Sequence, residues 1–478
     1  MVEVIAKLHS RLLPLVAVLL LSACATRQEP PLEPVELPAA FTRTGQPEVP
    51  DTWWQSFDDK QLNDLVAQAL DGNLGLRASY QRLRQARAVA DRQDAALFPT
   101  LDANAGAERQ ESDTTESSTF SAGLSASYEV DLWGRVQSLS EAEALRVSAT
   151  LGDYQAAAVS LSGEIATSWF QLVEQRAQYA LAGTQLETNR NVLTVIESRF
   201  GTGQSGSADV LRQRQLVSAS RERLSDIDGE IAVLEHQLAV LLGQSPGRGN
   251  LPEDDTLPIL PPLPETGIPA ELVQRRPDLR QAWWLIQAAD KDLAAAISDR
   301  FPRLSLDASA VSRAGDAGDL FDNWLATLAG NLLVPLVDGG ERRAEVRRSR
   351  AVLEELVQDY GQAVLTAIQE VEDALAREQQ QLRRLQSLEK QIRLADTTYR
   401  QLRTQYLNGA ISYLEVLTAL QDKQDLQRTR LTTRQQLLTA RVALYRALAG
   451  RIDVVESGDN RQTRTAVGRT ARYESPDR

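Results

Sequence analysis

The 478-residue sequence predicts a mainly α-helical fold with a four-stranded β contribution, and three observations lead to this prediction. Glutamate, glutamine, arginine, leucine and alanine are plentiful while aromatic residues make up only 5%, which suits long exposed helices. Four stretches alternate apolar and polar residues one for one, as strands with one apolar face do. One order of motifs also occurs twice along the chain, which indicates an internal duplication.

The N-terminus predicts a lipoprotein export signal over residues 1–23. Basic residues precede a short apolar run and small residues follow it, as in signal peptides rather than structural helices. The sequence Leu21-Ser22-Ala23-Cys24 resembles the bacterial lipobox, in which the cysteine is lipidated. Cys24 is the only cysteine in the chain, so no disulfide framework is expected. An ordinary signal peptide with a chance cysteine is the alternative.

The rest of the chain is predicted to hold two repeats of one plan. Phe98-Pro99 before one alternating stretch returns as Phe301-Pro302 before another, and the glycine-bearing turn at Gly203 returns at Gly409. Each repeat is expected to contain a helix, two strands, a very long helix, a glycine turn and another long helix. The expected divisions are an extended lead-in over 24–52, repeat 1 over 53–244 (strands about 100–131, long helices about 135–242), a proline-rich linker over 245–269, repeat 2 over 270–453 (strands about 302–336, long helices about 340–449) and a disordered tail over 454–478.

The second long helix carries a coiled-coil pattern. Apolar residues three or four positions apart run from Leu353 to Leu375 and again from Leu382 to Tyr406. An uninterrupted helix of this kind, from Gly340 onward, would be roughly 100 Å long. A structural filament is the simplest explanation of such a helix, although a filament needs neither strands nor a lipid.

The alternating stretches fit membrane strands. Strands of about ten residues can cross a bilayer at a tilt, and apolar residues outside with polar residues inside are typical of a water-filled barrel. Lipid does not tolerate open sheet edges, so four strands cannot close a barrel and the chain is expected to oligomerise. Three copies of four strands would supply twelve. A small soluble sheet that caps a helical domain is the alternative.

Composition and motifs argue against other function classes. The formal net charge of −13 disfavours general nucleic-acid binding, which needs a basic face. The mature chain holds one histidine, His236, and neither a phosphate-binding glycine loop nor a ligand-spaced cysteine or histidine cluster. We therefore expect no metal, no cofactor beyond a covalent lipid on Cys24, and no enzyme activity. A carboxylate-based catalytic site stays open, because acidic residues are abundant on the helices.

The order of several motifs resembles that of TolC-like outer-membrane efflux channels, and more closely that of their NodT-type lipoprotein members. The resemblance covers nearly all of the mature chain up to about residue 453. The segments that carry it are the lipobox ending at Cys24, Asp51-Thr52-Trp53-Trp54-Gln55-Ser56-Phe57, the two Phe-Pro pairs, Tyr128-Glu129-Val130-Asp131-Leu132-Trp133-Gly134-Arg135 and the two glycine turns.

The resemblance implies a homotrimer that shares a twelve-stranded transmembrane β-barrel in the bacterial outer membrane and a helical tunnel, or α-barrel, in the periplasm. An equatorial belt would form from Trp53–Leu70, the linker and the helix ends near Leu272. The lipid on Cys24 would anchor the chain in outer-membrane lipid. The implied partners are a periplasmic adaptor (membrane fusion) protein and an inner-membrane RND-type transporter, and the channel itself would hydrolyse nothing.

The resemblance also implies a pore gate at the periplasmic tips. Asp209 and Glu415 follow the two glycine turns, at the position where the matching family motif has an acid that faces the narrow pore mouth. Thr418 stands where the family often has a further acid, so a double acidic ring is in doubt. The alternative is that each acid only complements a helix N-terminus. The expected adaptor-docking turns are formed by Gly201, Gly203, Gly206, Asn408 and Gly409.

Together these features predict the exit duct of a tripartite pump that expels small toxic molecules such as drugs, dyes and detergents. A duct for type I protein secretion is the alternative within transport. A lipid-anchored periplasmic coiled-coil scaffold is the alternative from another class, and ion conduction would distinguish it. The sequence does not name the substrate, because selection in such systems belongs mainly to the pump.

Overall fold

The computed structural model describes residues 36–247 and 251–452. The predicted export signal, the lipidation residue Cys24 and the predicted tail over 454–478 lie outside these residues. Within the described ranges, no helix combines the length and the apolar character that crossing a membrane requires.

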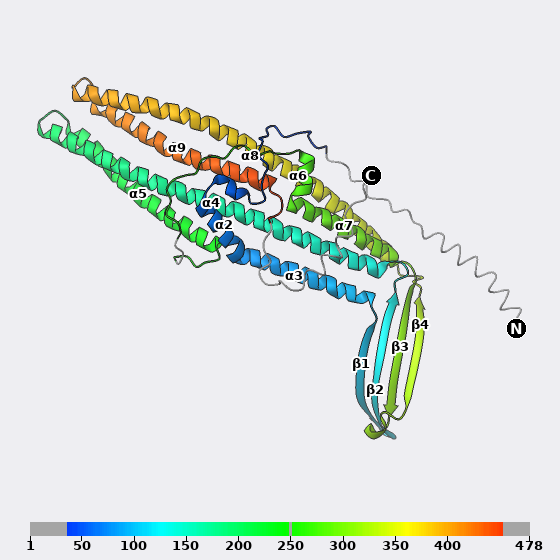
Figure 1. Ribbon diagram of the computed structural model, residues 1–478. Helices are drawn as coiled ribbons and strands as arrows, with labels where there is room; N and C mark the ends of the chain where they lie inside the picture. Colours follow the sequence, from blue (N-terminus) through cyan, green and yellow to red (C-terminus); the bar gives the residue numbers. More distant parts are fainter. Residues whose placement is uncertain (1–35, 248–250, 453–478) are drawn as a thin grey trace. The chain divides into compact units, whose positions relative to one another are not determined.

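The described chain runs through one order of elements twice (Figure 1). In each pass a helix leads into two antiparallel strands, and a 67-residue helix then turns back into a shorter one. The first pass consists of α3 (Leu74–Asp94), β1 (Thr100–Ser112), β2 (Thr115–Val130), α4 (Arg135–Gly201) and α5 (Ser207–Leu241). The second consists of α7 (Pro277–Ser298), β3 (Arg303–Ala314), β4 (Trp324–Leu333), α8 (Glu341–Leu407) and α9 (Tyr413–Leu448). Short helices precede each pass, namely η1 (Trp53–Phe57) and α2 (Lys60–Gly72), and α6 (Pro269–Arg275), while η2 (Ala95–Leu97) and η3 (Ala317–Asp319) lie within the passes.

The four strands form one antiparallel sheet in the order β1-β2-β3-β4. Its register brings the predicted apolar residues of all four strands to the same face, because side chains alternate sides along each strand. One transverse row of that face is Leu101, Ala126, Ala308 and Leu328. The neighbouring row on the opposite face is Asp102, Ser125, Ser309 and Thr327. Period-two alternation in the sequence thus becomes one apolar and one mostly polar sheet face.

The long helices pair into two hairpins, α4 with α5 and α8 with α9, and α4 also packs on α9. Both 67-residue helices begin after a glycine with positive φ, Gly134 at 72° and Gly340 at 92°, a backbone conformation that side chains disfavour. Leu353, Val364 and Leu375, from the predicted coiled-coil seam of α8, are buried. Val364 and Leu375 lie in the main core, and Leu353 packs on Ile286 and Ala289 of α7, so the predicted seam faces both the core and the preceding helix.

The main core lies where the short helices, the linker and the ends of α5 and α9 meet α4. Aromatic rings fill it: the Trp53 ring stacks on Tyr445 with 5.7 Å between centroids, and Phe57 meets Phe170 edge-on at 5.0 Å. Close approach matters at Gly152 on α4, where a Cβ would come within 2.8 Å of the Cβ of Gln281 on α7. A larger residue there would push the two helices apart.

A buried ion pair ties this core to the linker. The Arg441 guanidinium on α9 donates two hydrogen bonds to the Glu378 carboxylate on α8, at 2.7 and 2.9 Å, and both side chains are only 1% exposed. The remaining Nη1 of Arg441 donates to the carbonyl oxygens of Pro261 and Pro262, at 2.5 and 2.7 Å. Because residues 251–268 form neither strand nor helix, these carbonyls have no regular backbone partner, and the arginine satisfies them instead.

The lead-in before η1 is held by the same linker. The N–H of Gly45 donates to the carbonyl of Pro264 at 2.9 Å, and the N–H of Glu265 donates to that of Pro47 at 2.7 Å. Thr42 hydrogen-bonds the Glu372 carboxylate of α8 through its N–H and its hydroxyl, at 2.9 and 2.5 Å. The two proline-rich segments therefore run together across the surface of the second hairpin.

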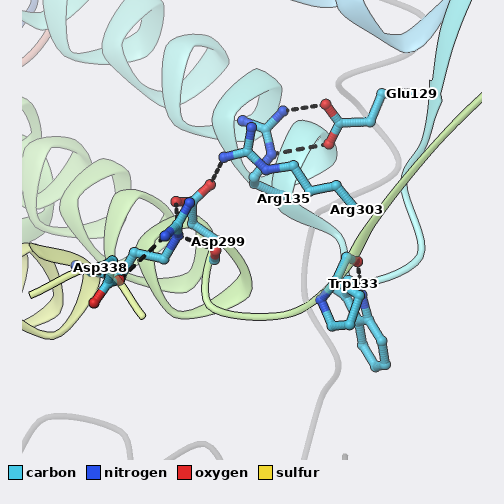
Figure 2. A network of polar contacts seen from close by, with 8 residues as sticks. Glu129, Trp133, Arg135, Asp299, Arg303 and Asp338 are labelled. Carbon is cyan, nitrogen blue, oxygen red and sulfur yellow. Dashed lines mark hydrogen bonds and ion pairs between the residues drawn. The ribbon is translucent and has the colours of Figure 1, made fainter. Parts of the chain in front are cut away.

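The sheet is joined to the helices by contacts within each repeat and by one set of contacts between the repeats (Figure 2). Trp133, just before α4, stacks on Phe301 with 4.9 Å between ring centroids, and its indole N–H donates to the carbonyl of Pro302 at 2.8 Å. Arg135 forms an ion pair with Glu129 at 2.7 Å. The Asp299 carboxylate pairs with both Arg303 and Arg342. Stacking and hydrogen bonding by Trp133 thus fix the end of β2 against the start of β3, while the ion pairs fix each strand end to the helices of its own repeat.

The buried pair sets a stability prediction. Glu378→Ala leaves the Arg441 charge buried without its counterion and should lower the free energy of unfolding by about 3–5 kcal/mol. Thermal and urea unfolding followed by circular dichroism measure the change. The matched control is Glu345→Ala, which breaks the exposed pair with Arg348 and should change the same quantity by less than about 1 kcal/mol. Equal effects of the two substitutions would contradict the assignment.

Candidate gate at the helix tips

The two predicted turns have the same backbone geometry. After α4, Gly203 has φ 73°, and the N–H groups of Gly203 and Gln204 donate back to the carbonyls of Phe200 and Arg199, at 3.0 and 2.8 Å. After α8, Gly409 has φ 74°, and the same pattern recurs with Ala410. This is the glycine-terminated helix end, in which a left-handed residue satisfies the last carbonyls. The other predicted docking residues surround these turns, since Gly201 ends α4, Gly206 precedes α5 and Asn408 follows α8.

Both predicted gate acids lie in the first turn of the helix that follows. The Asp209 carboxylate accepts hydrogen bonds from the Gly206 N–H at 3.3 Å and from the Ser205 hydroxyl at 3.1 Å. The Glu415 carboxylate accepts one from the Ser412 hydroxyl at 3.3 Å and is otherwise exposed. An acid in this position satisfies free N–H groups and complements the helix dipole. Asp209 therefore caps α5 by accepting the Gly206 N–H, whereas the hydrogen bond of Glu415 comes from a side-chain hydroxyl at the start of α9. A pore-facing role would be additional for either acid.

An apolar cluster joins the two hairpins just behind the turns. Its members come from four helices and bury one another: Ile196 of α4, Val210 of α5, Tyr406 of α8, and Tyr413, Val416 and Leu417 of α9. The rings of Tyr406 and Tyr413 are 5.5 Å apart between centroids. The Arg199 guanidinium lies 4.9 Å from the Tyr406 centroid, a cation–π contact between the hairpins. The tips therefore form one small core of their own.

Polar links cross the same boundary between hairpins. The Tyr413 hydroxyl of α9 donates to Gln213 Oε1 of α5 at 2.5 Å, and the Gln213 amide donates to the backbone carbonyl of Asn189 at 2.7 Å. Gln213 is completely buried. Burial raises the pKa of the Tyr413 hydroxyl far above its usual range, so the tyrosine keeps its proton and remains a donor. A single hydrogen-bonded chain thus connects both hairpins behind the glycine turns.

The links continue as a polar seam between α4 and α9. The Gln424 amide donates to Asn189 Oδ1 at 2.9 Å, and Arg428 donates to Gln185 Oε1 at 2.6 Å. Further along, the Thr432 hydroxyl donates to the buried Glu174 carboxylate at 2.9 Å. Hydrogen bonds between these side chains are directional, and their donors and acceptors can change partners. An apolar contact between the same helices would contain no donors or acceptors that could change partners.

The sequence reasoning missed these seam residues. Their signal was available in part, because Glu174, Gln178, Gln185 and Asn189 recur on α4 at heptad-like spacing where apolar residues are expected. Their partners lie more than 200 positions away, so only the folded chain identifies them. His236 is exposed on α5 and does not join the tip. In residues 36–247 and 251–452, histidine, cysteine and carboxylate side chains form no group of three that could hold a metal ion.

The structure joins a sheet that has one apolar face and two open edges to long hairpins, each with a glycine turn between its two helices. This is the architecture of a TolC-like outer-membrane channel subunit. The family described as "Outer membrane efflux protein" matches residues 65–244 and 268–450, one segment for each repeat. The chain belongs to this family.

Individual relatives match along nearly their whole length. The pyoverdine export outer membrane protein OpmQ of Pseudomonas aeruginosa is 33% identical over 455 residues, which cover 91% of this chain and 95% of OpmQ. The cation efflux system protein CusC of Escherichia coli strain K12 is 27% identical over 464 residues, 92% of this chain and 99% of CusC. The structure of the outer-membrane channel OprN is 28% identical, with a TM-score of 0.83, and the match covers 89% of this chain and 99% of OprN.

These findings confirm the predicted resemblance to outer-membrane efflux channels and the mainly helical fold with a small antiparallel sheet. The protein is an efflux channel of the outer membrane that extends into the periplasm. Members of this family are transporters rather than enzymes.

The inter-hairpin hydrogen bond yields a prediction. Tyr413→Phe removes the only donor to Gln213 Oε1 that the structure shows among its described residues, and it should weaken the tip association by about 0.5–1.5 kcal/mol. Amide hydrogen exchange should then become faster in residues 192–217 and 402–417 than in the rest of the hairpins. The control is Tyr179→Phe at a half-exposed position on α4. Unchanged exchange at the tips would show that this bond does not hold them together.

Proposed function

We propose that three copies of this chain form the exit duct of a tripartite efflux pump for small toxic molecules. A twelve-stranded barrel shared by the three copies would cross the outer membrane. The hairpins would line a periplasmic tunnel, and their tips would meet a periplasmic adaptor protein that connects the duct to an inner-membrane RND-type transporter. The lipid on Cys24 would add a second attachment to the outer membrane.

The observation that carries this proposal is the sheet. Its apolar face is large and exposed, with Leu101 at 71%, Leu124 at 47% and Leu328 at 82% exposure. A face of this kind in water would promote aggregation, whereas hydrocarbon would cover it. The unpaired edges of β1 and β4 need partners, because lipid offers no hydrogen bonds to backbone groups. Other copies of the same chain would supply those partners.

The helix tips support an adaptor-docking role for the two turns. Exposed apolar side chains flank each turn, Phe200 and Leu211 around the first and Leu407 and Leu414 around the second, with exposures between 45% and 64%. Exposed apolar residues at a sharp helix reversal are suited to contact with another protein. Glycine at these turns also serves the reversal itself.

The gate would depend on the acids beside the turns. Three copies would bring three Asp209 and three Glu415 carboxylates to the mouth of the tunnel. A ring of like charges attracts cations, excludes anions and stores repulsion that favours opening. Tyr413, Gln213 and the apolar tip cluster would oppose this repulsion and hold the mouth closed.

The cargo is proposed only as a class. OpmQ is named for pyoverdine export and CusC for cation efflux, so similar ducts serve chemically different cargoes. Within the described residues no cluster of metal ligands favours direct coordination of an ion. Drugs, dyes and detergents fit a wide duct without specific ligands.

The function is tested first in a strain that lacks the gene. Susceptibility to a panel of dyes, detergents, antibiotics, siderophores and metal salts is measured while the secreted proteins are profiled. We expect hypersensitivity to several small molecules, reversed by the wild-type gene. Loss of a secreted protein with normal susceptibility would replace efflux by type I secretion. Purified protein that conducts no ions in planar bilayers would favour the scaffold.

The gate is tested by removing charge while keeping the helix caps. Asp209→Asn and Glu415→Gln retain acceptor oxygens near the helix N-termini, so their effect on folding should be small. Together they should reduce the preference for cations over anions in planar-bilayer reversal potentials. Glu187→Gln, at an exposed position in the middle of α4, is the control for a general loss of negative charge. Ion selectivity equal to that of the control would rule out a pore-facing role for the two acids.

A further inference from the structure

Glu174 is a buried carboxylate in the polar seam between α4 and α9. Its side chain is 4% exposed and accepts hydrogen bonds from the Gln178 amide at 2.8 Å, the Thr432 hydroxyl at 2.9 Å and the Gln175 amide at 3.0 Å. All three donors are neutral, and the structure shows no ion pair for Glu174 within residues 36–247 and 251–452. The buried Gln178 Oε1 also lacks a donor among these residues. Because a buried carboxylate is costly without a counterion, this part of the seam lacks a positive charge.

Arg428 brings a positive charge to the same seam but places it elsewhere. The residue lies one helical turn before Thr432 on α9. Its guanidinium donates to Gln185 Oε1 at 2.6 Å and forms an ion pair with the exposed Asp425 of its own helix. Burial of the side chain, together with the nearby Arg223, lowers the pKa of Arg428 to about 10. Its positive charge is therefore incompletely compensated in this position.

The cation and the buried carboxylate are within reach of each other. Because the Gln178 side-chain nitrogen is 2.8 Å from Glu174 Oε1 and 3.0 Å from the Arg428 carbonyl oxygen, these two oxygens are less than about 6 Å apart. An arginine side chain is long enough to span this distance from its own backbone. In the structure the guanidinium instead contacts Gln185, which lies 11 positions closer to the tip of α4. Rotation of the side chain would exchange one partner for the other without a shift of either helix.

The present contact of Arg428 stands at the end of a hydrogen-bonded chain that leads to the tips. The Gln185 amide donates to the Gln424 carbonyl at 3.2 Å, and the Gln424 amide donates to Asn189 Oδ1 at 2.9 Å. The Asn189 carbonyl accepts from Gln213, the partner of the Tyr413 hydroxyl at the tip. A change at Gln185 can therefore reach the tips through contacts that the structure contains.

We propose that Arg428 is a positioning residue for the tips, with its guanidinium on Gln185 while the tips are together and on Glu174 when they separate. On leaving Gln185, the guanidinium deprives a buried amide oxygen of its donor and weakens the chain to the tips. On reaching Glu174, it gives a buried carboxylate its counterion. One stabilising contact thus replaces another, as a two-state element requires. This inference rests on the proposed gate and adds to it a residue in the middle of the hairpins.

The two partner positions should respond to substitution in opposite directions. Gln185→Leu removes the present partner of Arg428, so amide hydrogen exchange in residues 192–217 and 402–417 should become about fivefold faster. Glu174→Gln removes the charge of the alternative partner but keeps an acceptor oxygen, so the same exchange should become about fivefold slower. If these residues only stabilised the seam, both substitutions would break buried contacts and both would speed exchange.

A second variant and a charge-free background complete the test in the full-length protein. Gln185→Glu gives Arg428 a charged partner in its present position and should also slow exchange at the tips. In an Arg428→Met background, Glu174→Gln should no longer slow it. The matched controls are Glu187→Gln, exposed on α4, and Gln391→Leu, exposed on α8 at the position 206 residues after Gln185, the spacing that also separates Gly134 from Gly340. Neither control should change exchange at the tips.

The outcomes separate this inference from the proposed duct. Slower exchange in Glu174→Gln and Gln185→Glu, with the first effect lost in the Arg428→Met background, supports the inference. Unchanged or faster exchange in both variants overturns it, and so does an effect of Glu174→Gln that persists without Arg428. A monomeric native mass in detergent overturns the trimeric duct instead, and exchange at the tips of each chain still decides the role of Arg428.

Discussion

Backbone hydrogen bonding along the edges of the sheet is the constraint on which the rest of this structure depends. β1 and β4 each present a row of N–H and C=O groups that no strand among the described residues satisfies. Next to these edges lies an apolar face that water would not favour. In a membrane, both requirements are met together only when the sheet closes on itself with other copies. In the proposed trimer, oligomeric closure, the lipid contact and a central pore would have this one physical cause.

Because the chain is internally duplicated, closure of the sheet would need only two kinds of strand pairing. One strand pairing occurs within each repeat, and a second occurs between the repeats. The duplicated elements are not identical, however. The contact of Trp133 with Phe301 and Pro302 strengthens only the seam inside the chain. Side-chain contacts as well as backbone pairing therefore fix the boundary between the repeats.

The helix tips combine features that work against each other. Asp209 and Glu415 stabilise the starts of their own helices, yet the same carboxylates would repel their counterparts if several copies met at a narrow opening. The cluster around Tyr406 and Tyr413, with the hydrogen bond to Gln213, draws the two hairpins of one chain together. Apolar packing and a few directional hydrogen bonds thus act at the place where a duct must both close and open.

The sequence by itself determined the strands, their apolar faces, the long helices and the two glycine turns, because each depends on local periodicity or on the backbone freedom of a residue such as Gly203. Only the tertiary structure decided which residues meet across the hairpins. Tyr413 and Gln213 are 200 positions apart, and Glu378 and Arg441 are 63 apart, so no local pattern pairs them. It also showed that Asp209 caps its helix through the Gly206 N–H, whereas Glu415 accepts from the Ser412 hydroxyl, since hydrogen-bond geometry depends on folded coordinates rather than on residue type.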